Sequence, residues 1–260
     1  MKKVKIFVLE KRKVRLFCWI ALSLLLACIS LWVHLSGLPA NTFIDPKSGI
    51  IVIDPGHGGI DGGTNKDGIL EKEINLDVSR RLRTFLHEKG YKVVMTRDQD
   101  IALDHLDNTG QNRHHRDLNA RLDIINGSNA QLFLSIHVNC NFKKPSTDGG
   151  IVFYGDTFAE NKRLAYCIQR SLNGMEINGA KRTVHDPVEA KYYLLSFSKI
   201  PGAIVETAFM SNSTERHLLT TDEFREQLAR AVADGAEVYL KQSGEVLLPD
   251  PHYRQHMLIN

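Results

Sequence analysis

Hydrophobic residues fall into two kinds of run along this chain. Short continuous runs at 51–53, 132–134 and 203–205 are typical of buried strands, whereas Ile74, Val78 and Leu82 recur at helical spacing. The pattern predicts strands at 50–53, 91–96, 131–138, 151–154, 192–195 and 201–206, and helices at 71–89, 116–127, 158–173 and 222–241. Strands that alternate with helices indicate a three-layer α/β domain, with polar loops expected at 98–115 and 174–191.

The first 35 residues follow a different pattern. Residues 16–35 contain no Lys, Arg, Asp or Glu, and a helix of this length would rise about 30 Å, the thickness of a bilayer core. Seven basic residues lie within 1–15, which favours a cytoplasmic amino terminus and export of the remainder. We expect a single-pass membrane anchor rather than a cleaved signal, because no small residue stands two positions before Ala40. Cleavage would make the protein secreted, and lipidation at Cys28 is a further alternative.

Composition divides the chain into five segments. We expect a cytoplasmic basic segment at 1–15, a transmembrane anchor or signal at 16–35, a linker at 36–47, a catalytic domain at 48–242 and a flexible tail at 243–260. The net charge is +3, but the first 40 residues hold 7 basic and 1 acidic residues, which leaves −3 for the rest. No basic stripe with interleaved aromatic residues occurs in the sequence, so we expect no nucleic-acid partner.

The four cysteines give little indication of a metal site or a disulfide. Cys18 and Cys28 lie in the apolar segment and count there as small hydrophobic residues. Cys140 and Cys167 lack the CxxC spacing of a zinc knuckle. We expect ordinary thiols at these two positions, with a disulfide as the alternative.

Residues that could bind a metal ion lie where two predicted strands end. The first strand runs into a glycine-rich loop that carries His57, and the strand at 131–138 ends in His137. Glu71 opens the first predicted helix, where a carboxylate is favoured by the helix dipole. Two histidines and one glutamate form a usual ligand set for catalytic zinc, with one position left for water. A strand-end histidine more often satisfies a turn, and Glu71 also fits helix capping, with Glu73 as an equal candidate on composition.

Two further carboxylates stand out. Glu206 ends an apolar run, where burial would raise its basicity and suit it to act as a general base. The alternative is a paired glutamate at a strand end, because a buried carboxylate without a partner is costly. Asp54 precedes the glycine-rich loop, and we expect it to hydrogen-bond a ligand imidazole.

Together these segments resemble the zinc-dependent N-acetylmuramoyl-L-alanine amidases of the family-3 amidase domain. The matching motifs, in the order that this family has them, are IDPGHGG at 53–59, LEKEINL at 70–76, VMTR at 94–97, RLDIIN at 121–126, FLSIHVN at 133–139 and PGAIVETAFMSN at 201–212. The segments at 154–161 and 199–202 are similar to the spore-cortex, germination-associated branch. The loop at 98–115 is longer than in minimal members.

The resemblance implies a fold, a cofactor and roles for four residues. The fold would be a twisted, mostly parallel six-stranded sheet with helices on both faces. Zn²⁺ would be held by His57, Glu71 and His137, and Glu206 would be the catalytic glutamate. In the germination-associated branch the amidase strips peptide from muramic acid, after which a deacetylase and ring closure give muramic δ-lactam.

We therefore expect a bacterial hydrolase that cuts the amide between the lactyl group of N-acetylmuramic acid and L-alanine. Its partners would be peptidoglycan strands, the membrane through the anchor, and functionally a muramic acid deacetylase. Three alternatives stay open: a general cell-wall autolysin, a non-catalytic peptidoglycan-binding module of the same fold, and a peptidase that cuts within the stem peptide.

Overall fold

A computed structural model describes residues 12, 19–23, 49–177 and 179–242, in two units, Met1–Pro46 and Lys47–Asn260. Residues 19–23 are helical, and within the described ranges no helix has both the length and the apolar character to cross a membrane. The expected linker at 36–47 and tail at 243–260 lie outside the described residues, as do 1–15 apart from residue 12 and most of 16–35. These segments stay predictions.

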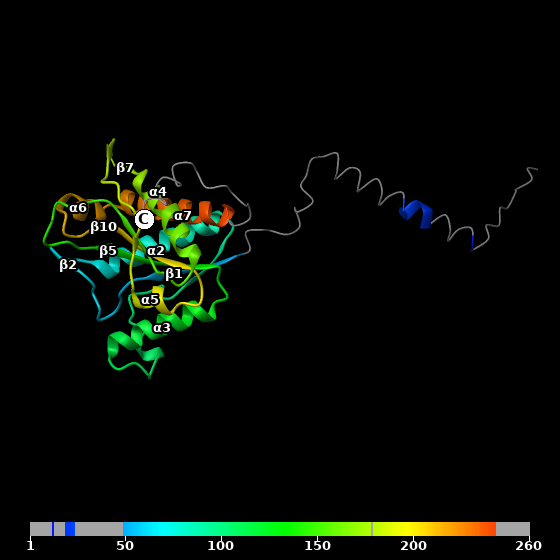
Figure 1. The fold of residues 1–260 in the computed structure, drawn as a ribbon, viewed down its shortest axis with the longest axis horizontal. Helices are drawn as coiled ribbons and strands as arrows, with labels where there is room; N and C mark the ends of the chain where they lie inside the picture. Colours follow the sequence, from blue (N-terminus) through cyan, green and yellow to red (C-terminus); the bar gives the residue numbers. More distant parts are fainter. Residues whose placement is uncertain (1–11, 13–18, 24–48, 178, 243–260) are drawn as a thin grey trace, which may run out of the picture. The chain divides into compact units, whose positions relative to one another are not determined.

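The second unit is built on one six-stranded sheet with the strand order β4-β1-β5-β10-β6-β9 (Figure 1). Its strands are β1 (Ile50–Pro55), β4 (Lys92–Met95), β5 (Leu132–Asn139), β6 (Ile151–Tyr154), β9 (Val188–Glu189) and β10 (Gly202–Phe209). All neighbouring pairs are parallel except β10 and β6. The expected mostly parallel six-stranded sheet is confirmed.

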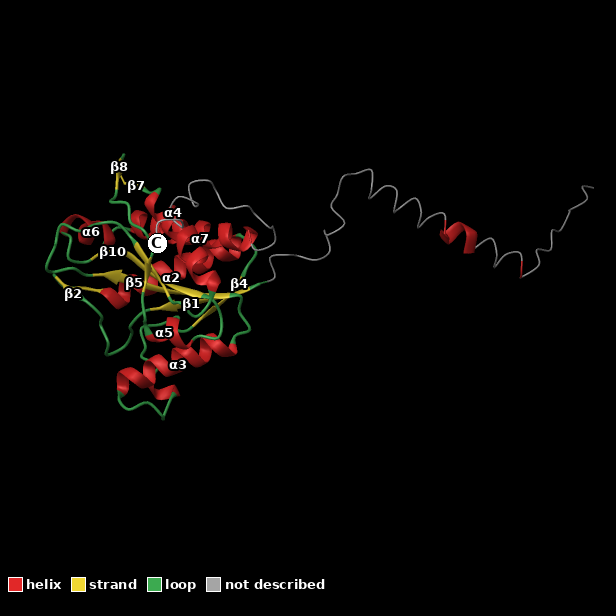
Figure 2. Cartoon of the chain, in the orientation of Figure 1, coloured by secondary structure: helices red, strands yellow, loops and turns green. Residues whose placement is uncertain are grey.

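Helices cover both faces of this sheet, which confirms the three-layer arrangement (Figure 2). One face carries α2 (Glu71–Glu88), α4 (Ala159–Asn173) and α7 (Asp222–Gln242), and the other carries α3 (Arg113–Gly127) and α5 (Tyr193–Phe197). Side chains alternate between two cores because successive strand residues point to opposite faces. Ile51 and Ile53 pack into the core under α2, α4 and α7, whereas Val52 packs into the core under α3 and α5.

The first crossover follows from the sequence pattern. Ile74, Val78 and Leu82 give α2 a continuous buried stripe along the sheet. Gly90 follows the helix with a φ of 89°, a left-handed conformation that glycine adopts without strain and that turns the chain into β4.

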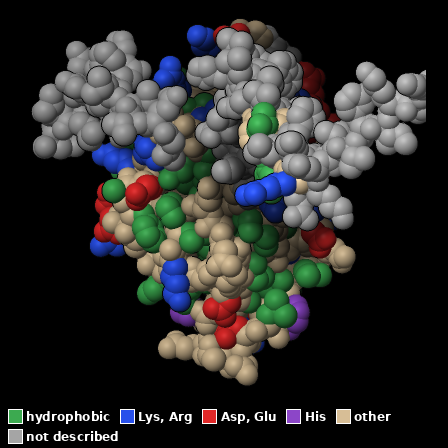
Figure 3. Space-filling model, turned by 90° about the vertical axis from the view of Figure 1, so that its right-hand side faces the viewer, with side chains coloured by type: hydrophobic (Ala, Val, Ile, Leu, Met, Phe, Trp, Pro, Cys, Tyr) green, Lys and Arg blue, Asp and Glu red, His purple; other side chains and the backbone are tan. Residues whose placement is uncertain are grey.

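Smaller elements lie between these. Two short hairpins pair β2 (Asn65–Lys66) with β3 (Ile69–Leu70) and β7 (Glu176–Ile177) with β8 (Ala180–Lys181). A single 3₁₀ turn, η1, spans Asp104–Leu106, and α6 spans Ser213–Leu219. On the face drawn in Figure 3, hydrophobic, basic and acidic side chains are interspersed.

The prediction of a strand at 192–195 is wrong. These residues enter the short helix α5, and the sixth strand is β9, within the segment expected to be irregular. An apolar run of four residues has too little length for its period to separate strand from helix. Leu194 and Leu195 are both buried against the core shared with α3, which a helical turn allows and a strand with one covered face does not. The loop expected at 98–115 is also partly helical, because α3 begins at Arg113.

Candidate active site

The glycine-rich loop after β1 brings His57 over the carboxyl end of the sheet. His57 has a φ of 61°, an uncommon left-handed backbone for a residue with a side chain. Two glycines leave room for its neighbours: a Cβ on Gly56 would lie 2.1 Å from the His137 ring, and one on Gly63 would lie 2.6 Å from Glu71 Oε2. The loop is therefore shaped around the side chains that meet there.

Glu71 contacts both histidines. The carboxylate is buried at the start of α2, and its Oε1 lies 3.1 Å from His57 Nε2 and 3.1 Å from His137 Nδ1. Its Oε2 accepts a hydrogen bond of 2.8 Å from the backbone N–H of Thr64. Glu73, the competing candidate, is exposed. The structure thus brings Glu71, and not Glu73, to the two histidines.

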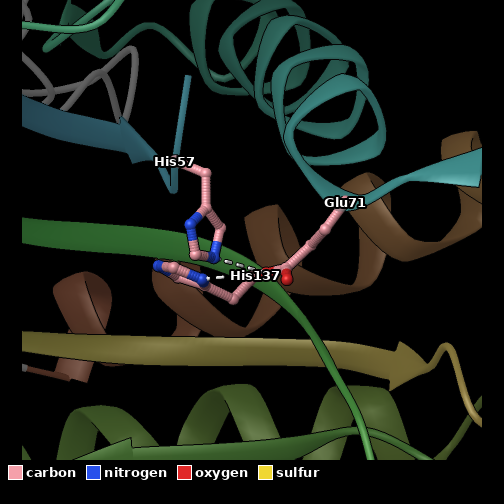
Figure 4. Close-up of side chains that lie close together, drawn as sticks. All are labelled: His57, Glu71 and His137. Atoms are coloured by element: carbon pink, nitrogen blue, oxygen red, sulfur yellow. Dashed lines mark hydrogen bonds and ion pairs between the residues drawn. The ribbon is translucent and has the colours of Figure 1, made fainter. Parts of the chain in front are cut away.

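The three side chains form one compact group of donor atoms. One ligand atom from each of His57, Glu71 and His137 lies within 4.8 Å of the others, and the imidazole rings meet edge to face with centroids 5.0 Å apart. Figure 4 shows the three side chains converging from the loop after β1, the start of α2 and β5. Segments far apart in the sequence therefore supply a single cluster.

The pKa values of His57 and Glu71 depend strongly on the charges of their neighbours in the cluster. Burial disfavours protonated His57, but the hydrogen bond and charge of Glu71, with a smaller contribution from Asp61, raise the pKa of His57 to about 9. Burial also opposes ionisation of Glu71, yet hydrogen bonds and charge from His137 and His57 lower the pKa of Glu71. The group favours a bound positive charge at neutral pH, whether a proton or a cation.

Glu206 lies on the strand next to His137. The two residues are register partners on the parallel strands β10 and β5, so their side chains project from the same face of the sheet. Glu206 Oε2 is buried and has no hydrogen-bond partner within the described residues. Burial, with the charge of Glu71 added and His137 acting against it, raises the pKa of Glu206 to about 7. A carboxylate with this pKa can exchange a proton near neutral pH.

Asp54 does not do what we expected. Its carboxylate accepts hydrogen bonds from Thr96 Oγ1 at 2.6 Å, Ser135 Oγ at 2.6 Å and Arg121 Nη1 at 2.7 Å, and none from an imidazole. Side chains alternate along β1, which directs Asp54 to a buried polar network below the loop. The expectation that Asp54 supports a ligand imidazole is therefore wrong.

Asp61 holds the imidazole instead. Its Oδ2 lies 2.9 Å from His57 Nδ1, which turns Nε2 of the same ring towards Glu71. The sequence contains one local indication of this contact: Asp61 stands four residues after His57 in the same glycine-rich loop, where the chain doubles back. An outer carboxylate of this kind fixes the tautomer and orientation of a metal-binding histidine.

Two buried arginines donate hydrogen bonds to the backbone of the glycine-rich loop. Arg121 donates to the carbonyl of Pro55 at 2.8 Å and to that of His57 at 2.5 Å. Arg97 donates to the carbonyls of Pro55 and Gly56, each at 2.9 Å. These bonds fix three consecutive carbonyl groups and with them the unusual backbone of His57. Both arginines stand in the motifs noted above, but the sequence gives no role for them.

A family model described as N-acetylmuramoyl-L-alanine amidase matches residues 51–238. The chain belongs to this family. The amidase is 35% identical over 202 residues to the germination-specific N-acetylmuramoyl-L-alanine amidase of Bacillus subtilis (strain 168), covering 77% of this chain and 84% of that protein. The expectation of family membership and of an amidase enzyme is confirmed.

Solved structures agree with this assignment. The amidase resembles the CwlD amidase from Clostridioides difficile, determined in complex with the GerS lipoprotein, with a TM-score of 0.65, 33% identity and coverage of 75% of this chain and 99% of that one. It also resembles AmiC2 of Nostoc punctiforme, with a TM-score of 0.62, 32% identity and coverage of 75% and 99%.

The donor set of the amidase fits zinc. Four ligands around Zn²⁺ at about 2.0–2.2 Å stand roughly 3.4 Å apart, and the two donor separations to Glu71 are 3.1 Å. Two imidazoles and one carboxylate are a common protein contribution to catalytic zinc sites.

Cys140 and Cys167 are free thiols, so the alternative of a disulfide between them is wrong.

Proposed function

We propose that the chain is a zinc amidase that cuts peptidoglycan at the bond between the lactyl group of N-acetylmuramic acid and L-alanine. His57, Glu71 and His137 would hold the ion, and Glu206 would be the catalytic residue. The observation that carries this proposal is the convergence of the three donor side chains beside a carboxylate of raised pKa.

The roles of the residues follow from their surroundings. Bound zinc supplies Lewis acidity, which polarises the scissile carbonyl and makes water more acidic. Glu206 accepts the proton of the attacking water on its buried oxygen, which has no hydrogen-bond partner in the described part of the chain, and returns it to the amine of the departing L-alanine. Asp61 keeps His57 Nε2 turned to the site, and Glu71 is fixed by Thr64.

Mass spectrometry of digested sacculi tests the bond that is cut. We expect the purified enzyme to release peptides with L-alanine at the new amino terminus, and a chelator to abolish release. A later residue at that terminus would indicate a stem peptidase, and the absence of release would indicate a binding module.

Two variants separate metal binding from proton transfer. Glu206→Gln keeps the shape of the side chain without its basicity, so it should retain zinc and lose turnover by about 10²- to 10⁴-fold. His137→Ala should lose zinc, as measured by metal analysis of the purified protein. Near-normal turnover in the glutamine variant would refute the role of Glu206.

We further propose that this activity serves the spore cortex, where removal of the peptide precedes deacetylation and muramic δ-lactam formation. The similarity to a germination-specific amidase supports this assignment. Spores that lack the protein should contain no muramic lactam. Normal lactam in such spores would favour a general autolysin.

The proposed location is the outer side of the bacterial cytoplasmic membrane, with 16–35 as the anchor. The uncharged run at 16–35 and its basic flank support this proposal. Protease added to intact protoplasts should digest the catalytic domain and leave the basic segment protected. A protected catalytic domain would contradict the orientation, and full-length protein in the medium would contradict the anchor.

A further inference from the structure

One stripe of α3 lies along the glycine-rich loop. Arg113, Asp117 and Arg121 follow each other at intervals of four residues, so they share one face of the helix. Arg121 reaches the carbonyl of His57 at 2.5 Å and binds Asp117 Oδ2 through Nε at 2.6 Å. Arg113 stands two turns before Arg121 on this stripe, at the end of α3 that belongs to the longer loop region of this chain.

The guanidinium of Arg113 has one nitrogen without a hydrogen-bond partner among the described residues. Its Nη1 is buried without a hydrogen-bond acceptor, and the nearby carboxylates are already occupied. Asp117 Oδ1 accepts from the N–H of Leu103 at 2.7 Å, and Asp61 accepts from Gly63 N at 3.1 Å while it binds His57. Arg113 is close enough to Asp61 to help lower the pKa of Asp61, after the larger effects of opposing burial and the bond to His57. A guanidinium with one unpaired, buried nitrogen, Nη1, thus lies on the β1 side of the site.

An exposed aromatic ring stands on the other side. Phe153 on β6 is the register partner of Ile204, and Ile151 is the partner of Glu206, so Phe153 lies diagonally from Glu206 on the same face. The ring of Tyr192 meets the ring of Phe153 edge to face at 5.4 Å and is 45% exposed. Burial and the charge of Glu206 together raise the pKa of Tyr192, as expected for neighbours.

The two features lie beside different strands of the site. Arg113 lies near Asp61 in the loop after β1, and Tyr192 contacts Phe153 on β6. The sheet order places β5 with His137 and β10 with Glu206 between these two strands. We propose that the substrate crosses the site in one direction, with the glycan against Tyr192 and Phe153 and a carboxylate of the stem peptide bound by Arg113.

The chemistry of the substrate decides this direction, and the inference rests on the function proposed above. The lactyl carboxyl group is consumed in the scissile amide, so the glycan side is uncharged there, whereas the peptide carries at least its terminal carboxylate. Arginine binds carboxylates with paired hydrogen bonds. Aromatic rings offer an apolar surface with a polar tip, which suits a sugar ring with apolar and hydroxylated faces.

Kinetics with Arg113→Gln test the peptide end. The substrates are a soluble glycan–peptide fragment with free peptide carboxylates and the same fragment with those carboxylates amidated. The variant should raise KM about tenfold for the free form, with kcat unchanged, and should leave KM for the amidated form at the wild-type value. The matched control is Arg230→Gln on α7, on the other face of the sheet, which should leave both values unchanged.

Tyr192 variants test the glycan end. Tyr192→Ala should raise KM by a similar factor for the free and the amidated fragments, because the glycan is the same in both. Tyr192→Phe keeps the ring and loses only the hydroxyl group, so it should raise KM less than Tyr192→Ala does. An unchanged KM in Tyr192→Ala, or a change that depends on amidation, would overturn the assignment of the glycan to this side.

The outcomes separate this inference from the proposed function. If the wild type releases peptides that begin with L-alanine but Arg113→Gln affects both fragments equally or neither, the direction of binding is wrong and the amidase assignment stands. If the wild type releases no such peptide, the proposed function fails. Calorimetric titration of the free and amidated stem peptides then makes the same comparison without turnover, and equal affinities for wild type and Arg113→Gln would overturn the inference.

Discussion

Replacement of Glu206 by glutamine should stabilise the metal-free protein at high pH. The pKa of Glu206 rises from its ordinary value of 4.5 to about 7, chiefly because of burial. The folded state therefore holds a proton that the unfolded chain releases, and stability falls as the pH rises between these two values. Glutamine cannot ionise, so the variant escapes this loss.

The size of the effect follows from the shift. Each pKa unit corresponds to about 1.4 kcal/mol, so ionised Glu206 lowers the free energy of unfolding by at most about 3.5 kcal/mol above pH 7. The contribution should be close to zero at pH 4, where the carboxyl group is protonated in both states. A divalent cation in the cluster would attract the carboxylate and reduce the effect.

Urea unfolding of wild type and Glu206→Gln, both with chelator, measures this difference. We expect the gap between their free energies of unfolding to widen by up to about 3 kcal/mol from pH 4 to pH 8, with the variant more stable at pH 8. The matched control is Glu73→Gln, an exposed glutamate on α2, for which the gap should stay constant. Parallel pH profiles for wild type and Glu206→Gln would refute the claim that Glu206 is desolvated.

Three further results are expected. Asp61→Asn should weaken zinc affinity about 10- to 100-fold in competition with a chromogenic chelator, because His57 Nδ1 loses its charged acceptor; unchanged affinity would contradict that role. Zinc binding at pH 7 should release about one proton, since the pKa of His57 is about 9, and calorimetry in buffers of different ionisation enthalpy would show no buffer dependence if this is wrong. Arg121→Met should lower the free energy of unfolding by about 3–5 kcal/mol, because Asp54 is then buried without its counter-charge, and a urea midpoint near that of the wild type would contradict this expectation.

The features predicted from sequence are those with a long or repeated pattern. The runs in β1, β5 and β10 are apolar and end in chemistry-bearing residues, so their burial and the position of the site at their carboxyl ends could be read directly. The helical stripe of α2 is equally clear. The motifs then selected Glu71 over Glu73, and burial in the structure agrees.

The features that were missed depend on contacts between distant segments. Asp54 and Asp61 are both close to His57 in sequence, and only the turn of the loop decides which of them faces the imidazole. The role of Arg121 depends on α3 packing against the loop after β1, which no local pattern encodes. The run that forms α5 was too short for its periodicity to be read, and β9 has only two residues.

The central claim is that three side chains hold one zinc ion beside Glu206. Anomalous diffraction at the zinc absorption edge, from crystals of the metal-loaded protein, tests it most directly. We predict one strong peak at about 2.0–2.2 Å from His57 Nε2, a Glu71 oxygen and a His137 ring nitrogen, with the Glu206 carboxylate facing it but not bound to it. A peak held by other residues, or imidazoles of His57 and His137 that share no ion, would contradict the account.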